Sequence, residues 1–252
     1  MDLKLRTLFS PDEILPYNYN KYLQPFIYSL LNDAALHDSK QIKLFSYSPV
    51  QLLRNTAPDA EIKGLIPSVD SYISFRTPCL SYLEKILATI AKQKDYNFGS
   101  IPFTLEVSEV PTPTFQETVT WKTTQGGTIF TKATDSPLHL IPSTLENKVL
   151  TRTSLKHSLL TKLQALYEKD LDAVELLRLP KTFDLVKTLP LSITDLNLQK
   201  LHKEAKHDTT FFSWGGFTTI EAPRNIQHAI HLLGLGTRTA DGYGHVNPSY
   251  RY

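Results

Sequence analysis

Hydrophobic and polar residues follow two different rhythms along the first hundred residues. Strand-like patterns cover residues 3–9, 42–48, 71–76 and 101–107. Between them lie two stretches whose apolar residues recur every three or four positions, as on one face of a helix. Their stripes are Tyr19, Tyr22, Leu23, Phe26, Ile27, Leu30 and Leu31, followed by Leu80, Leu83, Ile86, Leu87 and Ile90. The predicted order is strand-helix-strand twice in succession, which is the order of a ferredoxin-like domain.

Two proline-containing signals mark boundaries in this half. Thr77-Pro78 has the form of a helix N-cap followed by proline at the first helical position. Pro111-Thr112-Pro113 reads as a short, stiff connector. We therefore expect the first domain to end near residue 112.

The second half carries similar patterns in a similar order. Two β-rich runs, 118–124 and 128–131, flank Gly126-Gly127 and predict a hairpin. Leucines at 155, 159, 163 and 166 predict a helix over 154–169. A strand is expected over 211–221 with a bulge at Gly215-Gly216, then a helix over 225–233 and a strand over 243–247.

The stretch from 170 to 206 fits neither a helix nor a strand clearly. The second half otherwise repeats the layout of the first with added segments. The sequence therefore predicts an α+β protein of two tandem ferredoxin-like domains with antiparallel sheets, residues 1–112 and 113–252.

Composition narrows the class of protein without identifying it. The net charge of +2 is too small to indicate nucleic-acid binding by itself, so an anionic partner would need positive charge gathered locally. The single cysteine, Cys79, is expected to be a core residue in a reducing cytoplasm. No apolar run approaches the roughly 18 residues of a membrane helix, and the N-terminus lacks the apolar core of a signal peptide. A cytoplasmic location is expected.

A glycine-rich segment, Gly234–Gly244, is the main candidate for ligand binding. It follows a predicted helix and precedes a strand, whereas a dinucleotide-binding loop follows a strand and opens a helix. The segment also lacks the Gly-Lys-Ser/Thr of a phosphate loop, so the nucleotide-cofactor interpretation fails. Gly234 falls where a left-handed helix cap belongs.

Glycines let a backbone approach the phosphates of a ligand, and Arg238 could add a charged fork to such a contact. The alternative is a surface loop in which glycine serves only turn geometry. The residues expected to contact such phosphates here are Gly234, Gly236, Thr237, Arg238, Thr239, Gly242 and Gly244.

A second set of candidate phosphate contacts lies at and just before the N-terminal end of the helix predicted over 154–169. Lys148, Arg152 and Lys156 are spaced by four, with His157 beside them. On one helix they would form a basic ridge suited to a phosphate backbone, with Arg152 and Lys156 as the expected contacts. The alternative is an ordinary solvated helix face.

Two parts of the chain resemble a known family. Gly-Leu-Gly-Thr-Arg-Thr-Ala-Asp-Gly-Tyr-Gly, between the last helix and the last strand, resembles the signature loop of the RAMP superfamily of CRISPR-associated proteins. Leu15–Tyr19, Ile27–Leu31, Leu36-His37 and Lys43–Ser48 resemble the N-terminal region of one branch, the endoribonuclease that cuts the CRISPR transcript within its repeats. The two regions together cover about a quarter of the chain.

The resemblance implies two ferredoxin-like domains and RNA cleavage without a metal or other cofactor. In the family the 2′-hydroxyl before the scissile bond attacks the phosphate, leaving a 2′,3′-cyclic phosphate and a 5′-hydroxyl. The partner it implies is CRISPR repeat RNA within a precursor transcript. It leaves open a homodimer and association with CRISPR effector-complex subunits, and it implies no membrane.

The resemblance also implies catalytic residues, which match His37, Tyr28 and Lys43. A histidine can act as acid or base near neutral pH, and a lysine can stabilise the charge that develops on the phosphate. Tyr28 falls with Asn20 and Gln24 on the polar side of its helix, so we expect it outside the core.

No convincing metal site is present in the sequence. His202 and His207 are five residues apart and have no cysteine or acidic partner at ligand spacing.

Three interpretations remain open at this point. The first is the metal-independent endoribonuclease. The second is a non-catalytic RNA-binding subunit of a CRISPR effector complex, which would use the same glycine-rich segment without an active histidine. The third is a two-domain ferredoxin-like protein with an unrelated binding role. The group of Tyr28, His37 and Lys43 favours the first, because a purely structural subunit has no use for all three.

Overall fold

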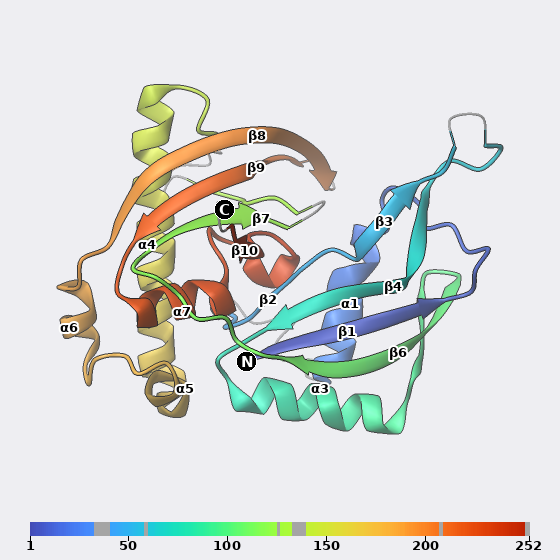
Figure 1. Cartoon of the computed structure of the whole chain (residues 1–252), viewed down its shortest axis with the longest axis horizontal. Coiled ribbons are helices and arrows are strands. Elements are labelled where there is room, and N and C mark those ends of the chain that lie inside the picture. Colours follow the sequence, from blue (N-terminus) through green and yellow to red (C-terminus); the bar gives the residue numbers. More distant parts are fainter. Residues whose placement is uncertain (33–40, 58–59, 125–126, 133–139, 207–208, 250–252) are drawn as a thin grey trace.

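The computed structural model contains two ferredoxin-like units lying side by side (Figure 1). It describes residues 1–32, 41–57, 60–124, 127–132, 140–206 and 209–249. Each unit has an antiparallel sheet with helices packed on one face, so the predicted α+β fold of two tandem units is confirmed. None of the helices in the described ranges is long and apolar enough to cross a membrane.

The first unit is built around the central strand pair β1 and β4. Its elements are β1 (Asp2–Phe9), α1 (Asn20–Leu31), β2 (Ser46–Tyr47), β3 (Gln51–Asn55), β4 (Leu65–Arg76), α3 (Leu80–Lys92), β5 (Asp95–Phe98) and β6 (Ile101–Val110). The strand order is β2-β4-β1-β6-β5, and β3 also pairs with β4. Leu3 and Leu5 of β1 are buried against α1 and α3, while Lys4 and Arg6 alternate onto the open face.

The second unit repeats this arrangement. Its elements are β7 (Thr118–Thr123), α4 (Leu145–Lys169), α5 (Leu171–Leu176), α6 (Phe183–Lys187), β8 (Ser192–Lys206), β9 (Thr209–Glu221), α7 (Arg224–Leu233), the short 3₁₀ helix η1 (Thr239–Asp241) and β10 (Val246–Pro248). The order β10-β7-β9-β8 matches β6-β1-β4-β2 of the first unit, strand for strand. The ambiguous stretch 170–206 forms two short helices and the long edge strand β8.

The hairpin predicted between 118–124 and 128–131 is wrong. Ile129 instead pairs with Trp214 of β9, and Phe130 pairs with Thr237 of the glycine-rich segment. The reason is that β9 and β10 occupy both edges of β7, so β7 offers no edge to the segment that follows it.

Three smaller expectations also change. The helix expected from Thr77-Pro78 starts at Leu80, because the Thr77 hydroxyl donates to the Leu44 carbonyl (2.7 Å) and Cys79 is the N-cap. The strand expected over 42–48 is limited to Ser46–Tyr47, and the last strand starts at Val246 rather than Tyr243. β2 pairs with β4 over only two residues, and β10 pairs with β7 over only three.

Two other details of the sequence prediction are supported. Cys79 is buried, which raises the pKa of its thiol to about 12. The pairing of β8 with β9 slips by one residue opposite Gly215-Gly216, although the extra residue, Gln199, belongs to β8.

A buried polar cluster joins the two units where β4 ends. Arg76 donates from Nε to Asp2 Oδ2 (2.7 Å) in its own unit and from Nη1 to the Val246 carbonyl (2.7 Å) in the other. His231 Nε2 of α7 lies 3.3 Å from the same Asp2 oxygen, and His245 Nε2 lies 3.1 Å from Ser74 Oγ. We call Asp2, Arg76, His231 and His245 the interface cluster.

Candidate functional site

The glycine-rich segment Gly234–Gly244 folds back on itself immediately after α7. All four of its glycines have positive φ, between 70° and 89°. A Cβ on Gly244 would lie 1.8 Å from the Leu235 carbonyl oxygen, because the Leu235 N–H donates to the Gly244 carbonyl at 2.9 Å. The glycines therefore meet a structural need, whatever else the segment binds.

Gly234 differs in detail from the predicted left-handed cap. Its φ of 70° is positive as expected, but its ψ of 176° is extended. The chain must leave α7 extended so that Leu235 can pair with Gly244. The prediction of a left-handed helical cap is therefore wrong, while the prediction that this position needs glycine is right.

Side chains of the first unit hold the segment in place. Gln24 of α1 donates from Nε2 to Asp241 Oδ1 (2.7 Å), and the Ser46 hydroxyl of β2 donates to the Leu232 carbonyl (3.2 Å). Arg238 donates from Nε to the other Asp241 oxygen (2.7 Å), and its guanidinium lies 5.5 Å from the centre of the Phe130 ring. Asp241 thus links α1 to Arg238 and fixes the direction of that arginine.

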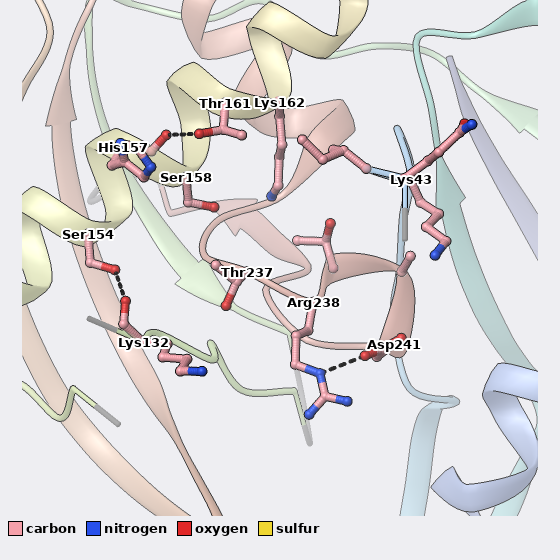
Figure 2. Close-up of a pocket in the computed structure, with 14 residues that line it drawn as sticks. Lys43, Lys132, Ser154, His157, Ser158, Thr161, Lys162, Thr237, Arg238 and Asp241 are labelled. Carbon is pink, nitrogen blue, oxygen red and sulfur yellow. Dashed lines mark hydrogen bonds and ion pairs between the residues drawn. The ribbon is translucent and has the colours of Figure 1, made fainter. Parts of the chain in front are cut away.

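A cavity of about 420 Å³ opens between this segment, α4 and the residues that lead into β2 (Figure 2). Its described basic side chains are Lys43, Lys132, His157, Lys162 and Arg238, and its one described carboxylate is that of Asp241. The hydroxyl groups in its wall belong to Ser154, Ser158, Thr161, Thr237 and Thr239. We call this the basic cavity. Its volume lies in the range of roughly 300–1,000 Å³ usual for small-ligand sites, and its charge suits an anion such as phosphate.

Lys162 is the most unusual residue of the basic cavity. Its side chain comes from α4 and extends toward the glycine-rich segment (Figure 2). It is 5% exposed, and its Nζ donates to the carbonyls of Leu233 (3.1 Å) and Gly234 (3.2 Å) at the end of α7. Burial lowers the pKa of Lys162 to about 7.

Sequence reasoning missed Lys162, although a signal was present. The leucines at 155, 159, 163 and 166 form the buried stripe of α4, and residue 162 lies within it, three after 159 and four before 166. A lysine inside an apolar helix stripe must find acceptors or face a cavity. Here it does both.

The predicted catalytic residues are placed as follows. Lys43 lines the basic cavity, just before β2 rather than within a strand. Tyr28 is buried, 7% exposed, and its ring lies edge-on to Phe45 at 6.1 Å between centroids. His37 lies outside the described residues.

The expectation that Tyr28 lies outside the core is wrong. The polar side of α1 is covered by the glycine-rich segment, which the Gln24–Asp241 bond holds there. Burial, followed by the charge of Asp241, raises the pKa of Tyr28 to about 12 despite a hydrogen bond with Gln24. Tyr28 therefore remains a neutral phenol at physiological pH.

The predicted basic ridge on α4 is divided between two surfaces. Arg152 donates from Nη2 to the Thr194 carbonyl of β8 (2.8 Å), and Lys148 lines a separate hollow with Asp195 and Asn197. Lys156 is exposed, and His157 lines the basic cavity. Among the described residues, no group of three histidine, cysteine or acidic side chains is placed to hold a metal ion.

Comparison with known proteins shows that this chain resembles several solved structures. No family model matches the chain, and no curated protein matches its sequence. A Cas6-related protein from Pyrococcus furiosus superposes with a TM-score of 0.72 at 15% identity, covering 100% of this chain and 99% of that one. A RAMP protein that binds different RNA substrates gives 0.71 at 16% identity, covering 99% of this chain and 100% of that one.

The Cas6 of Thermus thermophilus gives a TM-score of 0.54 at 15% identity, over 99% of this chain and 98% of that one. These similarities extend over the whole chain and cover both units. The chain therefore has the fold of Cas6 and related RAMP proteins, as the sequence resemblance implied.

Proposed function

We propose that this protein is a metal-independent endoribonuclease that cuts CRISPR precursor transcripts within their repeats. Solved structures with the same fold include a Cas6 bound to its product, with a TM-score of 0.55 at 18% identity, and a Cas6 bound to a substrate mimic, with 0.51 at 17%. The observation that carries the proposal is that Lys43 and the glycine-rich segment line one basic cavity.

RNA would be held in this cavity by its phosphates. Thr237, Arg238 and Thr239 lie in the wall formed by the glycine-rich segment, and Lys43 and Lys132 supply further positive charge. Charged donors of this kind bind phosphate oxygens and release the counterions that surround RNA. Gly234, Gly236, Gly242 and Gly244 give the segment its shape, and Arg152 and Lys156 remain predicted contacts on α4.

The reaction would proceed by attack within the RNA strand. A base removes the proton of the 2′-hydroxyl as its oxygen bonds to phosphorus, while the bond from phosphorus to the 5′-oxygen breaks and an acid protonates the leaving oxygen. The products are a 2′,3′-cyclic phosphate and a 5′-hydroxyl. His37 would transfer one of the two protons, a contribution of roughly 10²- to 10⁴-fold to the rate.

The position of His37 in the sequence is consistent with this role, since it precedes Gln41, a residue that lines the basic cavity, by four positions. A Cas6 in which a histidine was replaced by alanine is among the structures with this fold, with a TM-score of 0.54 at 16% identity. Lys43 would stabilise charge on the phosphate. Tyr28, a neutral phenol, would orient groups by hydrogen bonding rather than remove a proton.

Cleavage of repeat RNA in excess chelator tests the proposal. The wild-type protein should cut, and His37→Ala should slow the single-turnover rate by at least about a hundredfold while RNA binding persists. His202→Ala, on the β8 edge strand, is the matched control and should cut at the wild-type rate. Loss of cleavage on chelation would refute the metal-free mechanism, and full activity of His37→Ala would refute the assigned histidine.

The same assay addresses the second candidate function. A wild-type protein that binds repeat RNA and never cuts it would instead be a non-catalytic RNA-binding subunit of a CRISPR effector complex. That result would leave the basic cavity as a binding site only.

A further inference from the structure

The α4 wall of the basic cavity contains a group that the proposed reaction does not use. Lys162 is 5% exposed, lines the cavity and contacts the end of α7. One turn earlier on α4, the Ser158 hydroxyl donates to the Gly236 carbonyl at 2.7 Å. Residues 158 and 162 together hold three backbone carbonyls of the glycine-rich segment and the preceding α7 terminus. Lys162 is therefore placed to couple the cavity to the position of that segment.

Most hydrogen-bond donors in the α4 wall of the basic cavity are already used within the protein. The hydroxyls of Ser154, Ser158 and Thr161 each donate their hydrogen to a backbone carbonyl, at distances between 2.7 and 2.9 Å. A hydroxyl has one hydrogen to donate, so these three groups have none left for an anion. An ammonium has three, and two acceptors of Lys162 are present among the described residues. On α4, Lys162 can thus still offer a donor to a ligand.

Charged side chains line the basic cavity around Lys162 from each of the segments that form it. Lys43 lies before β2, Lys132 follows the bridge at Phe130, and His157 lies on α4 itself. Arg238 and Asp241 face it from the glycine-rich segment and are paired with each other at 2.7 Å. Among the described residues that line the cavity, Asp241 carries the one carboxylate. Burial disfavours the charge on Lys162, whereas an anion that entered the cavity would favour it.

We propose that Lys162 binds a backbone phosphate of the RNA and takes up a proton as it does so, which fixes the glycine-rich segment around the bound strand. The proposal rests on RNA being the ligand of the basic cavity, as proposed above. In this scheme Lys162 makes two kinds of contact, one with the RNA itself and one with the carbonyls at the start of the segment that also holds the RNA. Burial supports the proton step, because it lowers the pKa of the free amine to about 7, where a phosphate contact can restore the charge.

The test is the pH dependence of RNA binding. The probe is repeat RNA with 2′-fluoro in place of every 2′-hydroxyl, which lacks the attacking group, so binding is measured apart from cleavage. Between pH 7.5 and 9 the Kd of the wild-type protein should rise about tenfold, because free Lys162 loses its proton and binding must restore it. Histidines titrate mainly below this range. Lys162→Met should bind more weakly at pH 7.5 and show no such rise.

Two variants and a direct measurement separate this from a loss of structure. Lys132→Met removes an exposed cavity cation and should weaken binding by the same factor at each pH. Lys92→Met, on α3 outside the cavity, should bind as wild type. Calorimetry at pH 8 in two buffers of different ionisation enthalpy should show uptake of close to one proton per RNA for wild type and none for Lys162→Met. A purely structural lysine would change stability without changing proton uptake.

Each outcome decides one of the two proposals. RNA binding without the pH-dependent rise, or the same rise in Lys162→Met, would overturn the role of Lys162 and leave the endoribonuclease proposal intact. The expected rise without any cleavage of natural RNA would support Lys162 and overturn the endoribonuclease. A nucleoside monophosphate that bound as tightly as RNA with the same pH dependence would overturn the assignment of a strand phosphate.

Discussion

The two units meet at two polar regions that differ in how their charged side chains are paired and buried. In the interface cluster, Arg76 and Asp2 are 7% and 5% exposed and are paired at 2.7 Å, and burial keeps His231 and His245 neutral by lowering their pKa values. In the basic cavity, by contrast, the described lysines and Arg238 face a single described carboxylate across an open volume. Paired and buried charge joins the two units, whereas a cavity in which the described cations outnumber the described carboxylates suits an anionic ligand.

The largest expected effect comes from breaking the interface cluster. Arg76→Met would leave Asp2 buried without its guanidinium and the Val246 carbonyl without a donor. Removing one partner of a buried pair costs about 3–5 kcal/mol. We expect a loss of this size in the free energy of unfolding, measured by urea denaturation.

Arg6→Met is the matched control for this prediction. Arg6 pairs with Asp70 and Glu106 on the open face of the same sheet, where its side chain is 39% exposed. Exposed pairs contribute about 0–1 kcal/mol. Equal losses in the two variants would contradict the distinction between a sealed and an exposed ion pair.

The second prediction concerns acid. His231 has a pKa lowered to about 4 by burial, so between about pH 6.5 and 4 the unfolded chain binds a proton there that the folded chain does not. This contribution to stability is present above pH 6.5 and is lost as the pH falls toward 4, by up to about 1.4 kcal/mol per pH unit. Burial lowers the pKa of His245 in the same direction.

Urea denaturation at a series of pH values checks this sign. His231→Gln, which cannot be protonated, should remove its share of the slope and leave that of His245. Stability that did not change between pH 6.5 and 4.5, or an unchanged slope in His231→Gln, would show that this histidine is not buried neutral at the interface.

Part of the fold and of the candidate site could be predicted from the sequence. The paired units were predictable because most of their strands and helices are amphipathic over six residues or more, as in Leu3–Phe9 and the stripe of α1. Gly234 was recognisable as a position that needs glycine from its place after a helix. Such features depend on neighbours along the chain.

The errors concern contacts between distant segments. The edges of β7 are occupied by β9 and β10, about a hundred residues later, so no local pattern could exclude the hairpin at 118–131. Tyr28 lies on the polar side of α1 yet is buried, because the glycine-rich segment covers that side. The basic cavity likewise draws on four separate segments, so local patterns predicted some of its residues, such as Arg238, but not that they share one cavity with Lys43 and Lys162.

The smallest expected effect tests whether the charge of the basic cavity meets RNA phosphates. Each phosphate contact with single-stranded RNA contributes about 0.7 to the slope of log Kd against log salt, because binding releases condensed counterions. Lys132→Gln removes one exposed cation of the cavity. We expect the slope measured with repeat RNA to fall by about 0.7, with weaker binding at low salt.

Lys92→Gln on α3 should leave that slope unchanged, since Lys92 lies outside the basic cavity. Arg152→Gln sharpens the comparison, because Arg152 is bound to the Thr194 carbonyl on the other side of α4. A fall of about 0.7 for Arg152→Gln as well would extend the RNA path from the cavity onto the face shared by α4 and β8. A fall for Arg152→Gln and none for Lys132→Gln would contradict the cavity as the phosphate site and locate it on that face instead.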